Sequence, residues 1–243
     1  MNVEQLAVYF GAAVLAGFIH SSLGMGFGMI AMATTTLFVP YNNAAAVVSV
    51  ALLVLVFQIS ISLRKYIDWK EVVMPSIMLT IGKVIGIVLM MHLQSKLLRI
   101  SLGVFLIAYS VTQLLDIKAM RIKGTPLQAA VFCGLGGFFG GVFNVSGPAA
   151  AIYCQARYGY DPKRYAANMN CIFAPSAVVA VCMHIWYGNF NADAVVGSAS
   201  MVLAVLISAA VGVSVLKRIN AKNMRKLSYL YIIIMGAVIC ISG

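Results

Sequence analysis

The stretch "GVFNVSGPAAAIY" at residues 141–153 decides how this chain folds, because it places asparagine, serine, glycine and proline inside an otherwise aliphatic run. A buried polar group without a hydrogen-bond partner costs about 1–3 kcal/mol. An interruption of this kind therefore indicates a role in structure or function. It predicts a helix that breaks near its middle and restarts.

The composition is that of a membrane protein. The chain has 243 residues, of which 62% are hydrophobic and 9% charged, and its mean hydropathy is +0.97. Soluble domains carry about 25% charged residues. Six apolar runs reach or approach the roughly 20 residues that a membrane-spanning helix needs: 44–63, 72–92, 98–116, 165–187, 194–216 and 226–242. Because strand-like alternation is absent, we predict an all-α polytopic membrane protein.

An internal repeat divides the chain. The segment "LAGFIHSSLGMGFGMIAM" (15–32) aligns with "LGGFFGGVFNVSGPAAAI" (135–152), and their glycine-rich breaks coincide. We predict two structural repeats, 1–117 and 127–243, joined by a linker at 118–126 within one membrane domain.

Each repeat begins with an interrupted apolar stretch, 5–39 or 127–156, and continues with three full spans. Each interrupted stretch is too long to form one straight membrane span and barely long enough to form two. We therefore expect each to form a hairpin of two short helical arms. A hairpin plus three spans is an odd number of crossings, so the second repeat should be inverted and the two hairpin tips should meet near the membrane centre.

The distribution of basic residues predicts orientation. If each hairpin enters and leaves on a single side of the membrane, 14 of the 17 Lys and Arg residues lie on one side, and the other side holds only Lys96 and Arg99. They lie in the loops 64–70, 118–123, 157–164 and 217–226. The positive-inside rule then places these loops in the cytoplasm and both termini outside, as in a multi-pass protein of a prokaryotic-type inner membrane.

The breaks themselves predict a binding site. Ser146 and Gly147 suit the cap of a new helix at about 148–157, and Pro148 suits its first turn. The amino end of that helix offers free N–H groups and about half a positive charge, beside the polar side chain of Asn144. In the first hairpin the corresponding backbone comes from three glycines, Gly24, Gly26 and Gly28. Two opposed amino ends predict an anion site. Close helix packing is the alternative, and it suffices for Gly17 and Gly137.

Two ionisable residues are further candidates for this site. Lys83 lies mid-span, where insertion of an ammonium costs about 2.5–3.5 kcal/mol, so it either faces a cavity or snorkels between helices. His20 precedes the glycine break by one turn and could donate to an anion or titrate, or could be structural. The carboxylates fall in loops or at span ends, so the sequence offers no site for obligatory cation coupling.

The paired hairpins, "GFIHSSLGMGFGMIAM" (17–32) and "GGFFGGVFNVSGPAAAIY" (136–153), resemble those of the sulfite exporter TauE/SafE family of membrane transporters. The resemblance covers nearly the whole chain and implies export of small sulfur-containing anions, such as sulfite or organosulfonates. The family's second hairpin usually reads Gly-x-Gly-Gly-Pro, whereas this chain has Asn144 and Ser146 in place of the first two glycines.

Other functions remain as alternatives. An intramembrane hydrolase would use Ser146 with His20 or His184, and a thiol–disulfide carrier would use two of five cysteines that show no CxxC spacing. A packing subunit of a larger complex is the third. We expect a transporter rather than an enzyme, with no cofactor and no metal. Its expected partners are a small anion and membrane lipid, with no nucleic acid, and a homo-oligomer is compatible with the sequence.

Overall fold

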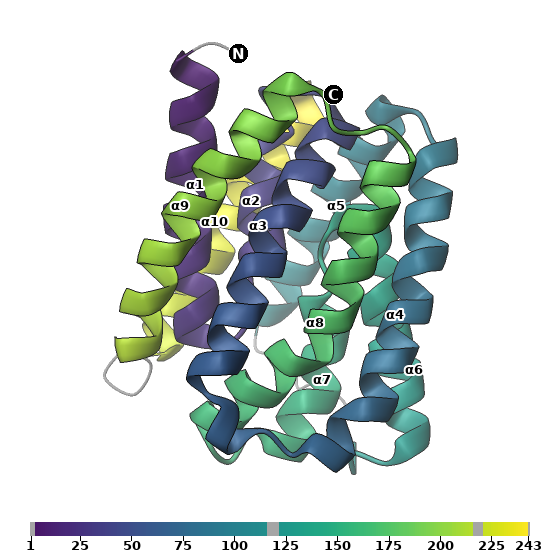
Figure 1. The fold of residues 1–243 in the computed structure, drawn as a ribbon, viewed down its shortest axis with the longest axis vertical. Coiled ribbons are helices and arrows are strands. Elements are labelled where there is room, and N and C mark those ends of the chain that lie inside the picture. Colours follow the sequence, from purple (N-terminus) through teal and green to yellow (C-terminus); the bar gives the residue numbers. More distant parts are fainter. Residues whose placement is uncertain (1–2, 116–121, 216–220, 243) are drawn as a thin grey trace.

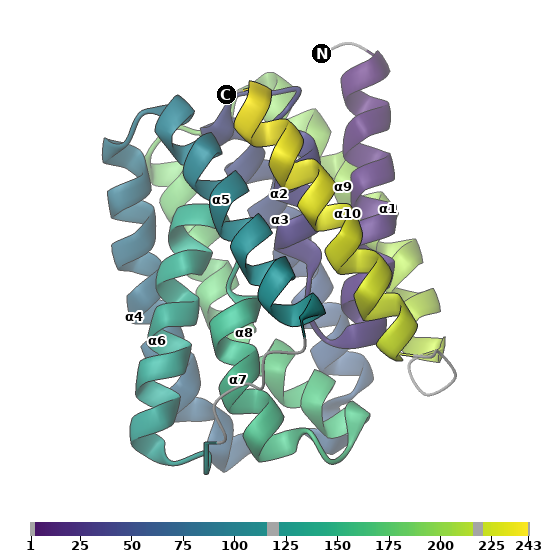
Figure 2. The ribbon, with the colours of Figure 1, turned by 180° about the vertical axis from the view of Figure 1, so that it is seen from behind.

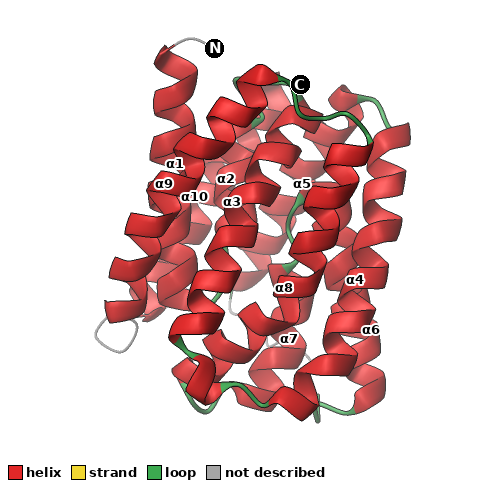
Figure 3. Ribbon diagram, viewed as in Figure 1, coloured by secondary structure: helices red, strands yellow, loops and turns green. Residues whose placement is uncertain are grey.

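A computed structural model describes residues 3–115, 122–215 and 221–242, and this part of the chain folds into helices joined by short connections, without strands (Figure 3). The elements are α1 (Val3–Leu23), α2 (Phe27–Thr35), α3 (Tyr41–Ser62), the short 3-10 helix η1 (Arg64–Tyr66), α4 (Trp69–His92), α5 (Ser95–Leu114), α6 (Pro126–Phe143), α7 (Gly147–Tyr158), α8 (Pro162–Trp186), α9 (Ala192–Val215) and α10 (Ala221–Ser242).

Eight of these helices are long and apolar enough to cross a membrane: α1, α3, α4, α5, α6, α8, α9 and α10. The prediction of an all-α polytopic membrane protein is therefore confirmed. Long apolar side chains such as Ile85, Leu203 and Ile207 remain about half exposed on the outer faces of the spans. A lipid bilayer is the environment in which such faces are stable.

The two halves use the same set of helix pairings. α1 packs along α9 as α6 packs along α4, α3 packs on α9 as α8 packs on α4, and α5 packs on α10. α3 and α8 also pack directly against each other. Figures 1 and 2 show α4, α6 and α8 on one side of the molecule and α1, α9 and α10 on the other.

Both interrupted stretches form hairpins, and the break falls where the sequence predicts it. Their arms are unequal, however, so the expectation of two short arms was wrong. The first arms, α1 and α6, have 21 and 18 residues, whereas the second arms, α2 and α7, have 9 and 12. The first arms stay continuous because the glycines within them serve packing. A Cβ on Gly17 would collide with the Ser208 hydroxyl of α9, and one on Gly137 with the Leu79 carbonyl of α4.

The short arms lie in opposite halves of the molecule. α2 lies in the half nearer both chain ends, and α7 lies in the half that contains η1 and the α7–α8 turn (Figures 1 and 2). The ends of the chain thus lie at one end of the bundle. The basic residues of η1, of the end of α7 and of the start of α8 lie at the other.

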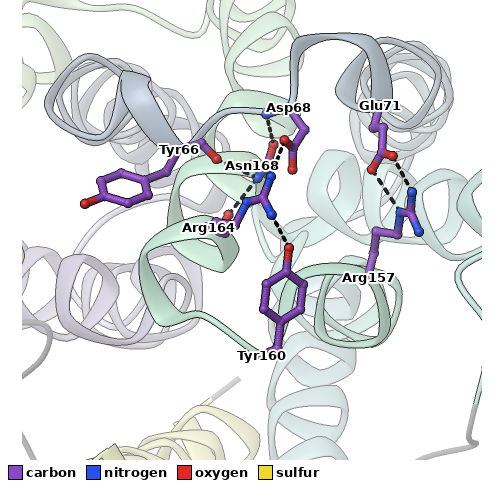
Figure 4. A network of polar contacts seen from close by, with 7 residues as sticks. All are labelled: Tyr66, Asp68, Glu71, Arg157, Tyr160, Arg164 and Asn168. Atoms are coloured by element: carbon purple, nitrogen blue, oxygen red, sulfur yellow. Dashed lines mark hydrogen bonds and ion pairs between the residues drawn. The ribbon is translucent and has the colours of Figure 1, made fainter.

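A polar network ties the start of α4 to the hairpin arm α7 and the start of α8 (Figure 4). Arg164 donates to Asp68 at 2.7 Å, and Arg157 forms an ion pair with Glu71. Asn168 accepts from the backbone N–H of Asp68 at 2.7 Å and donates to the Tyr66 carbonyl at 3.1 Å. Since the amide of Asn168 is buried, these bonds fix the base of α7 and α8 against the α3–α4 connection.

Candidate functional site

The tip of the first hairpin is a glycine turn. α1 ends at Leu23 and α2 begins at Phe27. Gly24 and Gly26 between them have φ angles of +82° and +117°, which side-chain-bearing residues rarely adopt. The ring of Tyr165 covers the turn, because a Cβ on Gly24 would lie 2.8 Å from Tyr165 Cε1. The sequence "GMGFG" therefore breaks the helix as predicted.

The tip of the second hairpin uses an asparagine for the same purpose. Asn144 ends α6 in the left-handed conformation, with φ of +58°, which asparagine tolerates better than most residues. α7 then runs from Gly147 to Tyr158 with Pro148 in its first turn, which confirms the predicted helix. Ser146 stands at the N-cap position, but its hydroxyl makes no capping hydrogen bond. Its expected capping role was thus wrong, because its backbone is already helical there.

The two tips touch through their backbones. A Cβ on Gly28 would collide with the carbonyl oxygen of Asn144, so only glycine permits this approach. On the other side of the contact, a Cβ on Gly147 would lie 3.5 Å from Met25 Cβ, which is ordinary van der Waals contact. The hairpins meet most tightly at Gly28.

A cavity of about 20 Å³ lies between the tips, which is room for about one water molecule. Six of the eight predicted site residues line it. Its lining consists of His20, Gly26, Phe27, Gly28, Met29, Leu52, Asn144, Val145, Ser146, Gly147 and Phe173. Gly24 and Lys83 are not part of this lining. The apolar members, such as Leu52 and Phe173, carry no signal in the sequence because they stand within uniformly apolar runs.

The backbone around the cavity is rich in donors. The first intrahelical bond of α2 is Ile30 N–H to Gly26 O, and that of α7 is Ala150 N–H to Ser146 O. The N–H groups of the residues before them have no partner within their own helices. Gly28 and Gly147, both in the cavity lining, belong to these first turns. Such groups, with the helix dipole behind them, suit an anion.

The three polar side chains at the tips differ in their hydrogen bonding. His20 uses both ring nitrogens: Nδ1 accepts the Phe27 N–H at 3.2 Å, and Nε2 lies 2.9 Å from Asn170 Oδ1. Asn144 donates to the Ala45 carbonyl at 2.8 Å. The Ser146 hydroxyl has no hydrogen-bond partner among the described residues. It is therefore the side chain in the lining that is left available to a ligand, and His20 is not oriented to activate it as a base.

Lys83 lies outside the cavity lining. Its side chain is 1% exposed and has no hydrogen bond or ion pair within the described part of the chain. Its backbone lies in the crossing of α4 with α6, where a Cβ on Gly137 would come 2.9 Å from Lys83 N. α4 packs against both α6 and α8. Lys83 thus packs beside the last turns of α6 without entering the cavity lining.

The fold and the paired tips define a multi-pass membrane protein whose central irregular backbone borders a small cavity lined by both polar and apolar residues. The model of the family described as sulfite exporter TauE/SafE matches residues 9–239, nearly the whole chain. The chain belongs to this family of membrane transporters, as its hairpins indicated. No curated protein and no solved structure gave a significant match.

Proposed function

We propose that this protein exports a small sulfur-containing anion, such as sulfite or an organosulfonate, through the site between its hairpin tips. The observation that carries the proposal is the cavity lined by the first turns of both α2 and α7. Two helix amino ends converge there, and each contributes N–H donors that have no partner within their own helix, together with a partial positive charge. Gly28, Ser146 and Gly147 are the contacts we assign to the anion's oxygens.

The proposed architecture is a pair of inverted repeats, 1–117 and 127–243, with a hairpin entering from each side. The matched pairing of α1 with α9 and of α6 with α4 supports it, as does the location of α2 and α7 in opposite halves. In transporters built this way, broken helices place the site at mid-depth and the two halves rock about it.

The small volume of the cavity implies that transport requires the tips to separate. A sulfite ion has four heavy atoms and does not fit a space that holds about one water molecule. The structure therefore corresponds to a closed form. Opening the contact between Gly28 and Asn144 on one side at a time would admit the anion from the cytoplasm and release it outside.

The membrane potential can drive this export. We propose a cytoplasmic location for η1 and the α7–α8 turn, with both chain ends outside in a prokaryotic-type inner membrane, because the basic loops favour that orientation. Expelling one negative charge from a negative interior is then favoured by about 2.3 kcal/mol per 100 mV. The residues lining the cavity include no carboxylate that would bind a coupling cation.

Purified protein in liposomes tests the proposal. Liposomes loaded with radiolabelled sulfite, a sulfonate or a carboxylate of similar size should release the sulfur anions under an inside-negative potential and retain them under the reversed one. The preferred anion at 100 times its dissociation constant should stabilise the protein by about 2.7 kcal/mol. Release equal to that of protein-free liposomes, with no stabilisation by any anion, would refute the proposed function.

A further inference from the structure

His20 bridges three segments of the chain through its imidazole. Nδ1 accepts the first N–H of α2, from Phe27, so the ring hydrogen must be on Nε2. Nε2 lies 2.9 Å from Asn170 Oδ1. The amide of Asn170 is oriented for this role because its Nδ2 donates to the Ala166 carbonyl at 2.8 Å. The Asn170 oxygen therefore selects the neutral His20 tautomer that can cap α2. We call His20, Phe27 and Asn170 the first latch.

An equivalent contact holds the second hairpin. Asn144, at the end of α6, donates to the Ala45 carbonyl at 2.8 Å and to the Ser49 hydroxyl at 3.0 Å. The Ser49 hydroxyl in turn donates to the Ala45 carbonyl at 2.8 Å. All three residues are buried. We call Asn144, Ser49 and Ala45 the second latch.

The two latches occupy matching places in the two halves. Ser49 is as far along α3 from Tyr41 as Asn170 is along α8 from Pro162. Each bonds the carbonyl of the alanine four residues earlier in its own helix, Ala45 or Ala166. Each also bonds the hairpin of the opposite half. The coincidence of position, bonding and burial at two sites is hard to attribute to packing alone.

Two tyrosines reinforce this crossed arrangement. Tyr165 of α8 covers the turn of the first hairpin at Gly24. Tyr41 of α3 donates its hydroxyl to the Val142 carbonyl, in the last turn of α6, at 2.8 Å. The first hairpin is therefore held by the span that follows the second hairpin, and the second hairpin by the span that follows the first.

We propose that Asn170 and Ser49 are positioning residues for the anion site, each fixing the hairpin tip of the other half. Neither belongs to the cavity lining, so neither binds the anion directly. Movement of α8 carries the tip at α2, and movement of α3 carries the tip at α6 and α7. The effect on transport rests on the proposed function, whereas the state of the His20 ring does not.

The His20 tautomer provides the direct test. The chain has three histidines, so the protein labelled with ¹⁵N-histidine should give ring signals that can be assigned with His92→Gln and His184→Gln. Wild-type His20 should show a protonated Nε2 and a bare Nδ1. Asn170→Leu removes the acceptor of the Nε2 hydrogen, so the population of this tautomer should fall. Asn168→Leu is the matched control, because Asn168 is also fully buried on α8 but bonds the Asp68 and Tyr66 backbone instead.

Anion affinity provides the functional test. Asn170→Leu and Ser49→Ala should each raise the concentration of sulfite for half-maximal efflux about fivefold, the factor that corresponds to one typical hydrogen bond. Ser49→Thr, which keeps the hydroxyl, should restore most of the affinity. Asn168→Leu should leave the affinity unchanged. Ser49→Ala is the variant to rely on if Asn170→Leu does not fold, because it removes only one oxygen atom.

The outcomes separate the two proposals. An unchanged His20 tautomer in Asn170→Leu would overturn the first latch, and so would an equal loss of affinity in Asn168→Leu. Wild-type affinity in Ser49→Ala would overturn the second latch. If the wild-type protein moves no sulfur anion while His20 shows the expected tautomer, the transport function fails and the first latch stands.

Discussion

Replacing Gly28 with alanine tests whether the contact between the hairpin tips holds the closed form together. The added Cβ would collide with the carbonyl oxygen of Asn144 and lie 2.8 Å from its carbonyl carbon. Asn144 has little room to yield, because its backbone is left-handed and its side chain is bonded to α3. Overpacking of this kind costs about 1–3 kcal/mol.

Gly147→Ala is the matched control. Both glycines stand in the first turn of a hairpin helix, where alanine favours the helix by at most about 1 kcal/mol. At position 147 this gain is smaller, because Pro148 follows and disfavours helical backbone in a preceding residue that has a Cβ. The new Cβ at position 147 would only reach ordinary contact with Met25, at 3.5 Å. The difference in unfolding free energy between the two variants therefore gives a lower limit for the cost of the collision at Gly28.

Thermal unfolding in detergent and sulfite efflux from liposomes measure the effect. Gly28→Ala should be less stable than Gly147→Ala by about 1–3 kcal/mol. Because the collision exists only while the tips touch, it should also shift the equilibrium from closed to open by about 5- to 150-fold. Equal stability and equal efflux in the two alanine variants would show that the tip contact does not control the closed form.

Four further predictions concern the site and the topology. Gly26→Leu should insert and fold but lose transport, because a φ of +117° strains any residue with a side chain, although space for the side chain is present. Sulfite efflux and the yield of folded protein measure this, and full efflux would show that the hairpin serves only helix packing. Ser146→Ala should weaken sulfite binding by about 1 kcal/mol in a thermal-shift titration, and unchanged affinity would remove the hydroxyl from the site. Lys83→Met should weaken anion affinity if the amine supplies long-range potential, and an affinity equal to wild type across a range of salt would assign Lys83 to packing. A cysteine at Lys123 should react with impermeant reagents only from the cytoplasmic side, and labelling from outside would refute the orientation.

The helices and the places where they break could be predicted from local residues. Runs of apolar residues fix the spans because hydrocarbon leaves few alternatives to a helix. Gly24, Gly26 and Pro148 predict the two breaks because their backbone preferences act within a few residues of the chain. The same reasoning placed six of the eight candidate residues around one cavity.

What the sequence left open depends on contacts between distant segments. His20 and Asn170 are 150 positions apart, so nothing local indicates that they bond. A glycine that packs against another helix, as Gly17 does, looks the same in sequence as one that breaks its own helix, as Gly24 does. Because of this ambiguity, the unequal lengths of the hairpin arms could not be predicted from the sequence. The sequence also does not predict which helix Lys83 packs against, because α4 has two buried neighbours, α6 and α8.

A membrane transporter must not discharge the membrane between transport cycles, and under the proposed function the meeting of the hairpin tips would provide the electrical seal. Protons cross hydrocarbon, about 30 Å thick, along continuous chains of water. At the tips the space narrows to about one water molecule, with Phe27, Val145 and Phe173 in its walls. A solitary water offers no chain, and an unaccompanied ion meets a large desolvation cost among such side chains. Under the proposed function, the close approach at Gly28 would insulate the bilayer between transport cycles, and widening it should appear first as a leak current.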